Sequence, residues 1–203
     1  MTADDVAGFG RALAAGGVVL FPSDTVYGLA ADPASAAAVH RLYALKGRPP
    51  ERPSAVMFFG LEPALEALSE LGPRTIAALK ALLPGPLTLV LPNPARRYPL
   101  ACGPYPERLG LRVPRLSGAL EPLGAVGRAV LQSSANRSGG VEARRLEDVD
   151  ELVRAGVDLE LDGGELRGTA STVVDLASYE EAGHFEVLRE GAVPAARIVA
   201  ELS

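Results

Sequence analysis

Hydroxyl-bearing and cationic side chains gather at the ends of apolar runs along this chain. The most informative group is Ser23, Asp24 and Thr25, which follows directly on the apolar run Gly17–Phe21. Further polar groups at the ends of apolar runs are Lys46–Pro49, Gly110–Pro114, Ser133–Gly139, Ser171–Leu176 and Leu188–Gly191. Loops at strand ends commonly carry binding groups, so we expect these segments to meet in one cleft that holds a small ligand.

The chemistry of this set is anion binding, because it offers cations and hydroxyls without an evident general base. Arginine binds phosphate or carboxylate through a planar fork, whereas lysine acts as a point charge. Such groups suit phosphoryl chemistry, in which alignment and charge neutralisation supply most of the acceleration. The sequence has no Walker A loop, dinucleotide-binding glycine fingerprint or metal-type His/Cys cluster. Ser133 and Ser134 lack the Gly-x-Ser-x-Gly context of a hydrolase nucleophile.

Length and composition predict a single globular α/β domain over residues 1–203. The 203 residues are 48% hydrophobic and 22% charged, which excludes a disordered chain. The formal net charge of -5 argues against a general nucleic-acid coat. Cys102 is the one cysteine, and neither a secretory signal nor a run long enough to span a bilayer is evident. We therefore expect a cytoplasmic protein without membrane contact.

The elements that must position these groups are short strands alternating with helices. Helices are expected at Ala3–Ala15, Pro33–Leu45, Pro63–Leu71, Pro73–Leu83, Leu116–Val126, Val149–Ala155 and Pro194–Leu202. Strands are expected at Val18–Phe21, Ser54–Phe59, Leu87–Leu91, Leu109–Val113, Ala129–Gln132, Leu159–Leu161, Thr172–Leu176 and Phe185–Leu188. This mixture favours a mixed, twisted sheet with flanking helices. Pro92–Pro106 carries five of the 17 prolines and is expected to be an exposed irregular loop.

Taken together and in order, these motifs resemble those of the YrdC/TsaC family of threonylcarbamoyl-AMP synthases, over nearly the whole chain from Gly17 to Val193. The resemblance implies a YrdC-like fold, a twisted mixed sheet with an open concave cleft. It also implies a reaction that combines L-threonine, bicarbonate or CO2 and ATP into L-threonylcarbamoyladenylate and pyrophosphate, with Mg2+ accompanying ATP and held mainly by its phosphates. The product would feed the tRNA modification N6-threonylcarbamoyladenosine.

The resemblance also implies roles for individual residues. Those matched to the threonine substrate are Ser23, Thr25, Arg112, Ser133 and Ser171. Those matched to ATP are Lys46, Arg48, Arg52, Ser134, Asn136 and Arg189, with Lys46 and Arg48 as the catalytic phosphate clamp. The chain departs from the family pattern at Ser23, which replaces Thr, and at Met57, where many longer relatives carry His. Arg52-Pro53-Ser54 also replaces the common Lys-Pro-Leu.

Three alternatives belong to other classes. An RNA-binding module would use a basic cleft but would need aromatic stacking platforms, and the chain has only five Phe, five Tyr and no Trp. A carbamoyltransferase of the hydrogenase-maturation type would need zinc-finger and acylphosphatase segments, and a homologue with a dead site would be expected to have lost Lys46, Arg48 or Asn136. We expect small-molecule substrates, downstream tRNA-modification enzymes as partners, at most weak RNA binding, and no extra C-terminal domain.

Overall fold

The computed structural model describes residues 1–202. The strands within these residues are β1 Val19–Pro22, β2 Tyr27–Ala31, β3 Ala55–Met57, β4 Leu87–Pro92, β5 Arg108–Arg112, β6 Val130–Ser134, β7 Leu159–Glu160, β8 Thr172–Asp175 and β9 Glu186–Arg189. The helices are α1 Ala3–Ala14, α2 Ala36–Lys46, α3 Leu61–Ala67, α4 Pro73–Leu82, α5 Pro99–Cys102, α6 Glu151–Ala155, α7 Tyr179–Ala182 and α8 Ala195–Leu202, with 3-10 helices η1 Gly118–Ala125 and η2 Leu146–Asp148. Among residues 1–202, no helix has the length and apolar character needed to cross a membrane.

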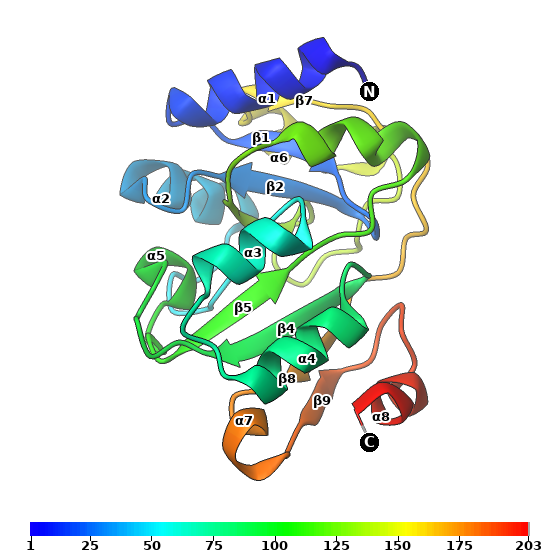
Figure 1. Cartoon of the computed structure of the whole chain (residues 1–203). Helices are drawn as coiled ribbons and strands as arrows, with labels where there is room; N and C mark the ends of the chain where they lie inside the picture. The colour runs from blue at the N-terminus through cyan, green and yellow to red at the C-terminus, as the bar shows by residue number, and fades with distance from the viewer. Residues whose placement is uncertain (203) are drawn as a thin grey trace.

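The strands form one mixed sheet in the order β7-β1-β2-β6-β3-β5-β4-β8-β9 (Figure 1). Three neighbouring pairs are parallel, namely β1 with β7, β3 with β5, and β4 with β8. The other neighbours run antiparallel. Figure 1 shows α1 lying along β1 and β7 at one end of the sheet, and α3 and α4 in front of β5 and β4. The fold class expected from the sequence, a mixed sheet with flanking helices, is confirmed.

Two hydrophobic cores cover the two faces of the sheet. The larger core packs α2, α3, α4 and α6 against one face, where Leu20 and Leu111 are fully buried. The smaller core packs α1 and η1 against part of the other face. Its centre holds Phe9 of α1 edge-to-face with Phe21 of β1, with ring centroids 5.3 Å apart. The smaller core covers its face only from β1 through β2 and β6 to Met57 of β3.

The rest of that second face is built from small or polar side chains. On β4, Leu89 is buried in the larger core, whereas Thr88 and Val90 on either side of it are only half-buried. Gly110 of β5 pairs with Val90 on one side and with Ala55 of β3 on the other. Residues paired across a ladder point to the same face. The side chains of this row are therefore too small to fill the face, and the sheet is left concave and open there.

The expectation of an exposed irregular loop over Pro92–Pro106 is confirmed in part: eight of its 15 residues are exposed, but the loop is ordered. The segment contains α5, and Asn93 within it is buried. The Asn93 side-chain amide donates hydrogen bonds to the carbonyls of Arg97, at 3.0 Å, and Pro106, at 2.9 Å. Pro99 is the first residue of α5, a position where a missing N–H leaves no hydrogen bond unmade. The prolines therefore shape an ordered, internally bonded loop.

Candidate functional site

A cleft of about 350 Å³ opens on the concave part of the sheet. Its lining residues with polar side chains are Thr25, Arg48, Ser54, Thr88, Tyr105, Arg108, Arg112, Gln132, Ser133, Ser134, Glu142, Ser171 and Arg189. Four of these are arginines and one is a carboxylate. Because guanidinium groups bind carboxylates and phosphates through paired hydrogen bonds, this cleft is suited to small anionic ligands.

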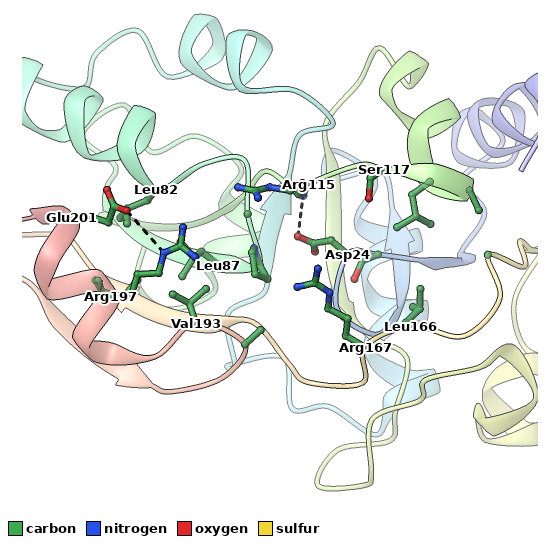
Figure 2. Close-up of a pocket in the computed structure, with 18 of the residues that line it drawn as sticks. Asp24, Leu82, Leu87, Arg115, Ser117, Leu166, Arg167, Val193, Arg197 and Glu201 are labelled. Carbon is green, nitrogen blue, oxygen red and sulfur yellow. Dashed lines mark hydrogen bonds and ion pairs between the residues drawn. The ribbon is translucent and has the colours of Figure 1, made fainter.

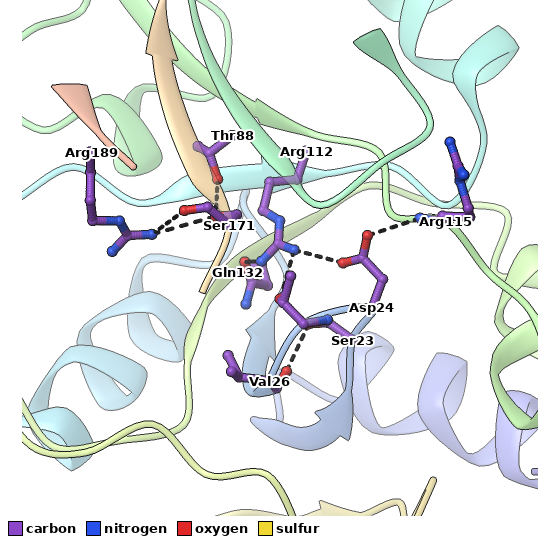
Figure 3. A network of polar contacts seen from close by, with 10 residues as sticks. Ser23, Asp24, Val26, Thr88, Arg112, Arg115, Gln132, Ser171 and Arg189 are labelled. Atoms are coloured by element: carbon purple, nitrogen blue, oxygen red, sulfur yellow. Dashed lines mark hydrogen bonds and ion pairs between the residues drawn. The ribbon is translucent and has the colours of Figure 1, made fainter. Parts of the chain in front are cut away.

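At the centre of the cleft, the buried guanidinium of Arg112 is held by three acceptors (Figure 3). Its Nη2 donates to Asp24 Oδ1 at 2.8 Å and to Thr25 Oγ1 at 3.1 Å, and its Nη1 donates to Gln132 Oε1 at 3.3 Å. Both side chains of the Arg112–Asp24 ion pair are only 5% exposed. Burial raises the pKa of the Asp24 carboxyl, and the Arg112 charge opposes that rise. Arg112 is therefore locked in one orientation before any ligand arrives.

Two buried donors in this network have no hydrogen-bond partner among residues 1–202. They are Arg112 Nε and Gln132 Nε2. Buried donors in folded proteins are almost always paired, and leaving one unpaired costs about 1–3 kcal/mol. These unpaired donors belong to the Arg112 network, so a ligand acceptor bound there would complete its hydrogen bonding.

The turn that carries Thr25 is fixed from both sides. Ser23 Oγ donates to the carbonyl of Val26 at 2.7 Å and lies 3.0 Å from Thr25 Oγ1. From the segment between β7 and β8, the Gly168 N–H donates to the Thr25 carbonyl at 3.0 Å. Asp24 is anchored by the Arg115 N–H, which donates to its Oδ2 at 3.0 Å. The hydroxyl of Thr25 therefore has a defined position at the cleft wall.

The opposite wall presents a second hydroxyl beside a second arginine. Ser171 precedes β8, and its Oγ lies 2.8 Å from Thr88 Oγ1 on β4. Arg189 at the end of β9 donates from Nη2 to the Ser171 carbonyl at 2.8 Å (Figure 3). The strand order places β8 between β4 and β9, which explains how Thr88 and Ser171, 83 positions apart in sequence, meet beside Arg189.

Lys46 holds the loop that carries Ser134 and Asn136. Gly47 ends α2 in the left-handed conformation, with φ 57°. The Lys46 ammonium is buried and donates to the carbonyls of Ser134 and Asn136, the latter at 2.6 Å. Ser134 Oγ in turn donates to Asn136 Oδ1 at 2.5 Å. Burial lowers the pKa of Lys46 to about 8. Its ammonium thus reaches loop carbonyls, and Lys46 is not among the residues that line the cleft.

Arg48 lies at the cleft, but its guanidinium folds back on its own loop. It donates to the carbonyls of Arg52, at 3.3 Å from Nε, and Pro53, and it lies over the Tyr43 ring at 5.8 Å from the centroid. Burial lowers the pKa of Arg48. Arg52 is exposed and its side chain does not line the cleft.

The structure therefore brings together most, but not all, of the residues predicted to form the site. Seven of them line the cleft: Thr25, Arg48, Arg112, Ser133, Ser134, Ser171 and Arg189. Lys46 and Asn136 lie behind it in the loop network, Ser23 lines a neighbouring pocket, and Arg52 lies outside both. Met57 is fully buried in the smaller core, where its side chain packs against other apolar side chains.

Several cleft residues were missed by sequence reasoning. They are Ser54, Thr88, Tyr105, Arg108, Gln132 and Glu142. Thr88 had a usable signal, because it alternates with the buried Leu87 and Leu89 on a predicted strand and must point to the other face. Glu142 gives no such signal, since it lies in an irregular segment after β6.

Fold and site together define a class of protein, an α/β protein with one twisted sheet whose open, arginine-lined cleft suits small anions. Comparison with known proteins is more specific. The family model Sua5_yciO_yrdC, described as "Telomere recombination", matches residues 11–191. The chain therefore belongs to the Sua5/YciO/YrdC family.

Two relatives named threonylcarbamoyl-AMP synthase illustrate the similarity. The chain is 37% identical to the Chromohalobacter salexigens protein, over 88% of this chain and 96% of the relative. It is 34% identical to the Pyrococcus abyssi protein, over 88% of this chain and 52% of the relative. The chain thus spans about half the length of the second relative.

Solved structures agree with this relationship. The structure of P. abyssi Sua5 complexed with L-threonine superposes with a TM-score of 0.85 at 31% identity, covering 99% of this chain and 58% of Sua5. The Escherichia coli YciO structure superposes with a TM-score of 0.79 at 23% identity, covering 95% of this chain and 92% of YciO, which shows a shared fold.

Proposed function

We propose that this chain has threonylcarbamoyl-AMP synthase activity, as a nucleotidyltransferase that converts L-threonine, bicarbonate or CO2 and ATP into L-threonylcarbamoyladenylate and pyrophosphate. The observation that carries the proposal is the meeting of Thr25, Arg112, Ser171 and Arg189 in one cleft. The matching fold of Sua5, whose structure was solved with L-threonine, supports it. In this proposal the protein acts in the cytoplasm as a single domain. Its product, L-threonylcarbamoyladenylate, is passed to tRNA-modification enzymes.

In this proposal the cleft binds the two substrates side by side. Arg112 would receive the threonine carboxylate or carbamate, while the hydroxyls of Thr25 and Ser171 orient the amino acid. Arg48 and Arg189 would hold the nucleotide phosphates, and the loop of Ser134 would contact the nucleotide. Lys46 would act by holding that loop, in line with its hydrogen bonds to the carbonyls.

The reaction needs two steps. The threonine amine attacks CO2 and loses a proton, which gives a carbamate. A carbamate oxygen then attacks the α-phosphorus in line while the bond to pyrophosphate breaks. The carbamate is labile in water, so the chain's contribution is to bind, orient and shield both anions.

Mg2+ would supply part of the neutralisation of the phosphate charge. Glu142 is the only carboxylate among the cleft-lining residues, and residues 1–202 contain no group of three or more His, Cys, Asp and Glu side chains that could hold a metal. Protein-bound Mg2+ commonly takes one or two carboxylates together with substrate phosphates and water. The donors present therefore fit an ion that arrives with ATP.

The proposal is tested by incubating the purified protein with ATP, Mg2+, bicarbonate and labelled threonine. We expect labelled threonylcarbamoyladenylate and pyrophosphate in equal amounts. The variant Arg48→Ala should lose most of this activity, and Arg11→Ala, at an exposed position on α1, should keep it. Absence of both products from a folded protein would contradict the proposal.

An RNA-binding module is the alternative function, and measurements of tRNA binding and of melting temperature distinguish it from a synthase. With a net charge of -5, we expect weak and steeply salt-dependent tRNA retention. ATP with threonine should raise the melting temperature through ligand linkage. Tight, salt-resistant tRNA binding without such a thermal shift would favour the RNA module.

A further inference from the structure

A second pocket, of about 320 Å³, lies on the far side of the turn formed by Ser23 and Asp24. It is enclosed by α4 and α8 on one side and by the segments around residues 115–120 and 163–167 on the other. Figure 2 shows Asp24, Arg115 and Arg167 together on one wall, facing Arg197 and Glu201 of α8. None of the roles proposed for the cleft uses this space.

The second pocket contains guanidinium groups that lack acidic partners. Arg167 forms no hydrogen bond or ion pair with any other residue of the described chain, and its guanidinium lies beside the Asp24 carboxylate (Figure 2). The Arg115 side chain donates only to the carbonyl of Pro84, at 3.1 and 3.3 Å. Arg197 approaches Glu201 no closer than 3.9 Å, at the exposed rim. The unpaired positive charge is therefore concentrated at Arg115 and Arg167.

The acidic residues on the same walls are committed elsewhere. Asp24 is paired with Arg112 in the neighbouring cleft, at 2.8 Å. Glu165 is shared by Arg144 and Arg145, at 2.8 and 2.7 Å. These pairings satisfy the carboxylates, and neither Arg115 nor Arg167 forms an ion pair with them. These two guanidiniums would repel a cationic ligand, whereas they would form charge-assisted hydrogen bonds with an anion.

Apolar side chains form part of the remaining lining. Leu82, Leu87 and Val193 line the part of the pocket near Arg197 (Figure 2). Leu166 lies beside Arg167. A volume of about 320 Å³ is at the lower end of the range for small-molecule sites.

We propose that the second pocket binds a small organic anion, with one carboxylate or phosphate within reach of the Arg115 and Arg167 guanidiniums and an apolar body against Leu82, Leu87 and Val193. Such a ligand is separated from the cleft by a single residue. Asp24 accepts from the Arg115 N–H on this side and from Arg112 on the other. A ligand in the second pocket would therefore lie close to the Asp24 carboxylate, which holds Arg112 in the cleft.

The test uses phenylacetate as the probe and phenethylammonium, with the same apolar body and the opposite charge, as its control. Binding to the isotope-labelled full chain is followed by amide chemical shifts. We expect phenylacetate to saturate shifts at residues 165–167 and 192–193 and phenethylammonium to bind at least about tenfold more weakly. The carboxylate and phosphate forms are separated by repeating the titration with phenyl phosphate.

Three variants make the assignment specific. Arg167→Gln should weaken phenylacetate binding about tenfold, because it removes one charge-assisted hydrogen bond and disturbs no contact of the free protein. Arg11→Gln, an exposed arginine on α1, and Ser171→Ala, in the cleft, should leave it unchanged. Equal binding of the two probes, unchanged binding to Arg167→Gln, shifts confined to the cleft, or no saturable shift up to the solubility limit would overturn the proposal. None of these results depends on synthase activity, so the proposed function stands or fails separately.

Discussion

Replacing Lys46 by methionine tests whether a buried ammonium holds the loop behind the cleft. Lys46 is 2% exposed, and burial lowers its pKa from 10.5 to about 8. Between these two values the unfolded chain binds a proton that the folded protein does not. The free energy of unfolding of the wild type therefore rises with pH across this window. Methionine has similar volume and does not titrate, so the variant lacks this contribution.

The size of the effect follows from the shift. One pKa unit corresponds to about 1.4 kcal/mol, so the full shift of Lys46 amounts to about 3 kcal/mol. Methionine also leaves the carbonyls of Ser134 and Asn136 without their donor, which lowers its stability at every pH. The prediction therefore concerns the slope. The stability difference, wild type minus variant, should grow by about 3 kcal/mol between roughly pH 8 and 10.5.

The measurement is urea unfolding of both proteins at a series of pH values, followed by circular dichroism. Other groups titrate in this range, but they are common to both proteins and cancel in the difference. Lys80→Met provides the matched control, because Lys80 is the only other lysine and lies exposed on α4. We expect no comparable slope for that variant. A stability difference for Lys46→Met that stays constant from pH 7 to 10.5 would refute the reasoning.

Three further outcomes follow from the cleft. Asp24→Asn should lower the free energy of unfolding by about 3 kcal/mol, because the buried Arg112 charge loses its counterion, and calorimetry showing a loss below about 1 kcal/mol would contradict this. Arg48→Ala should weaken ATP binding by about 1.5–3 kcal/mol, and Arg48→Lys should also be impaired; unchanged titration isotherms would argue against the phosphate role. Turnover should favour threonine over serine, and both over valine, since the hydroxyls of Thr25 and Ser171 would lose a partner. Equal rates for threonine and valine would exclude that assignment.

Local patterns were sufficient to predict many of the elements. The helix expected at Ala3–Ala15 is α1, and the strand expected at Leu87–Leu91 is β4, because each shows the apolar period of its type. The helix expected at Leu116–Val126 is the 3-10 helix η1, which has Pro122 inside it. A proline removes a main-chain donor, so the residues around it form a tighter, shorter helix.

The strand β2, Tyr27–Ala31, was not predicted, and its sequence explains why. All five residues are buried, so there is no alternation between apolar and polar positions. Gly28 and the two alanines have low strand propensity, and a lone tyrosine and leucine do not offset them. The strand exists because β1 pairs with it on one side and β6 on the other. That partnership is a property of the whole sheet and leaves no local signal.

The candidate site shows the same division between local and long-range information. The residue types at Thr25, Arg112 and Ser171 could be interpreted from their own segments, because a hydroxyl or an arginine at a strand end faces a cleft or solvent. The direction of the Lys46 side chain could not, since it is set by carbonyls 88 and 90 positions away in sequence. In this structure Lys46 positions a loop, and its predicted contact with phosphate stays a prediction.

Two residues paired in the sheet lie on either side of the boundary between the smaller core and the cleft. Met57 of β3 and Arg112 of β5 are partners in the ladder and point to the same face. Met57 is covered by the phenylalanines of the smaller core, whereas Arg112, one strand further along, is enclosed by the hydroxyl and carboxylate of the Thr25 turn. The smaller core therefore borders the Arg112 guanidinium directly. Electrostatic attraction is stronger where water is excluded, so the same hydrophobic packing that stabilises α1 and η1 also strengthens the buried ion pair between Arg112 and Asp24.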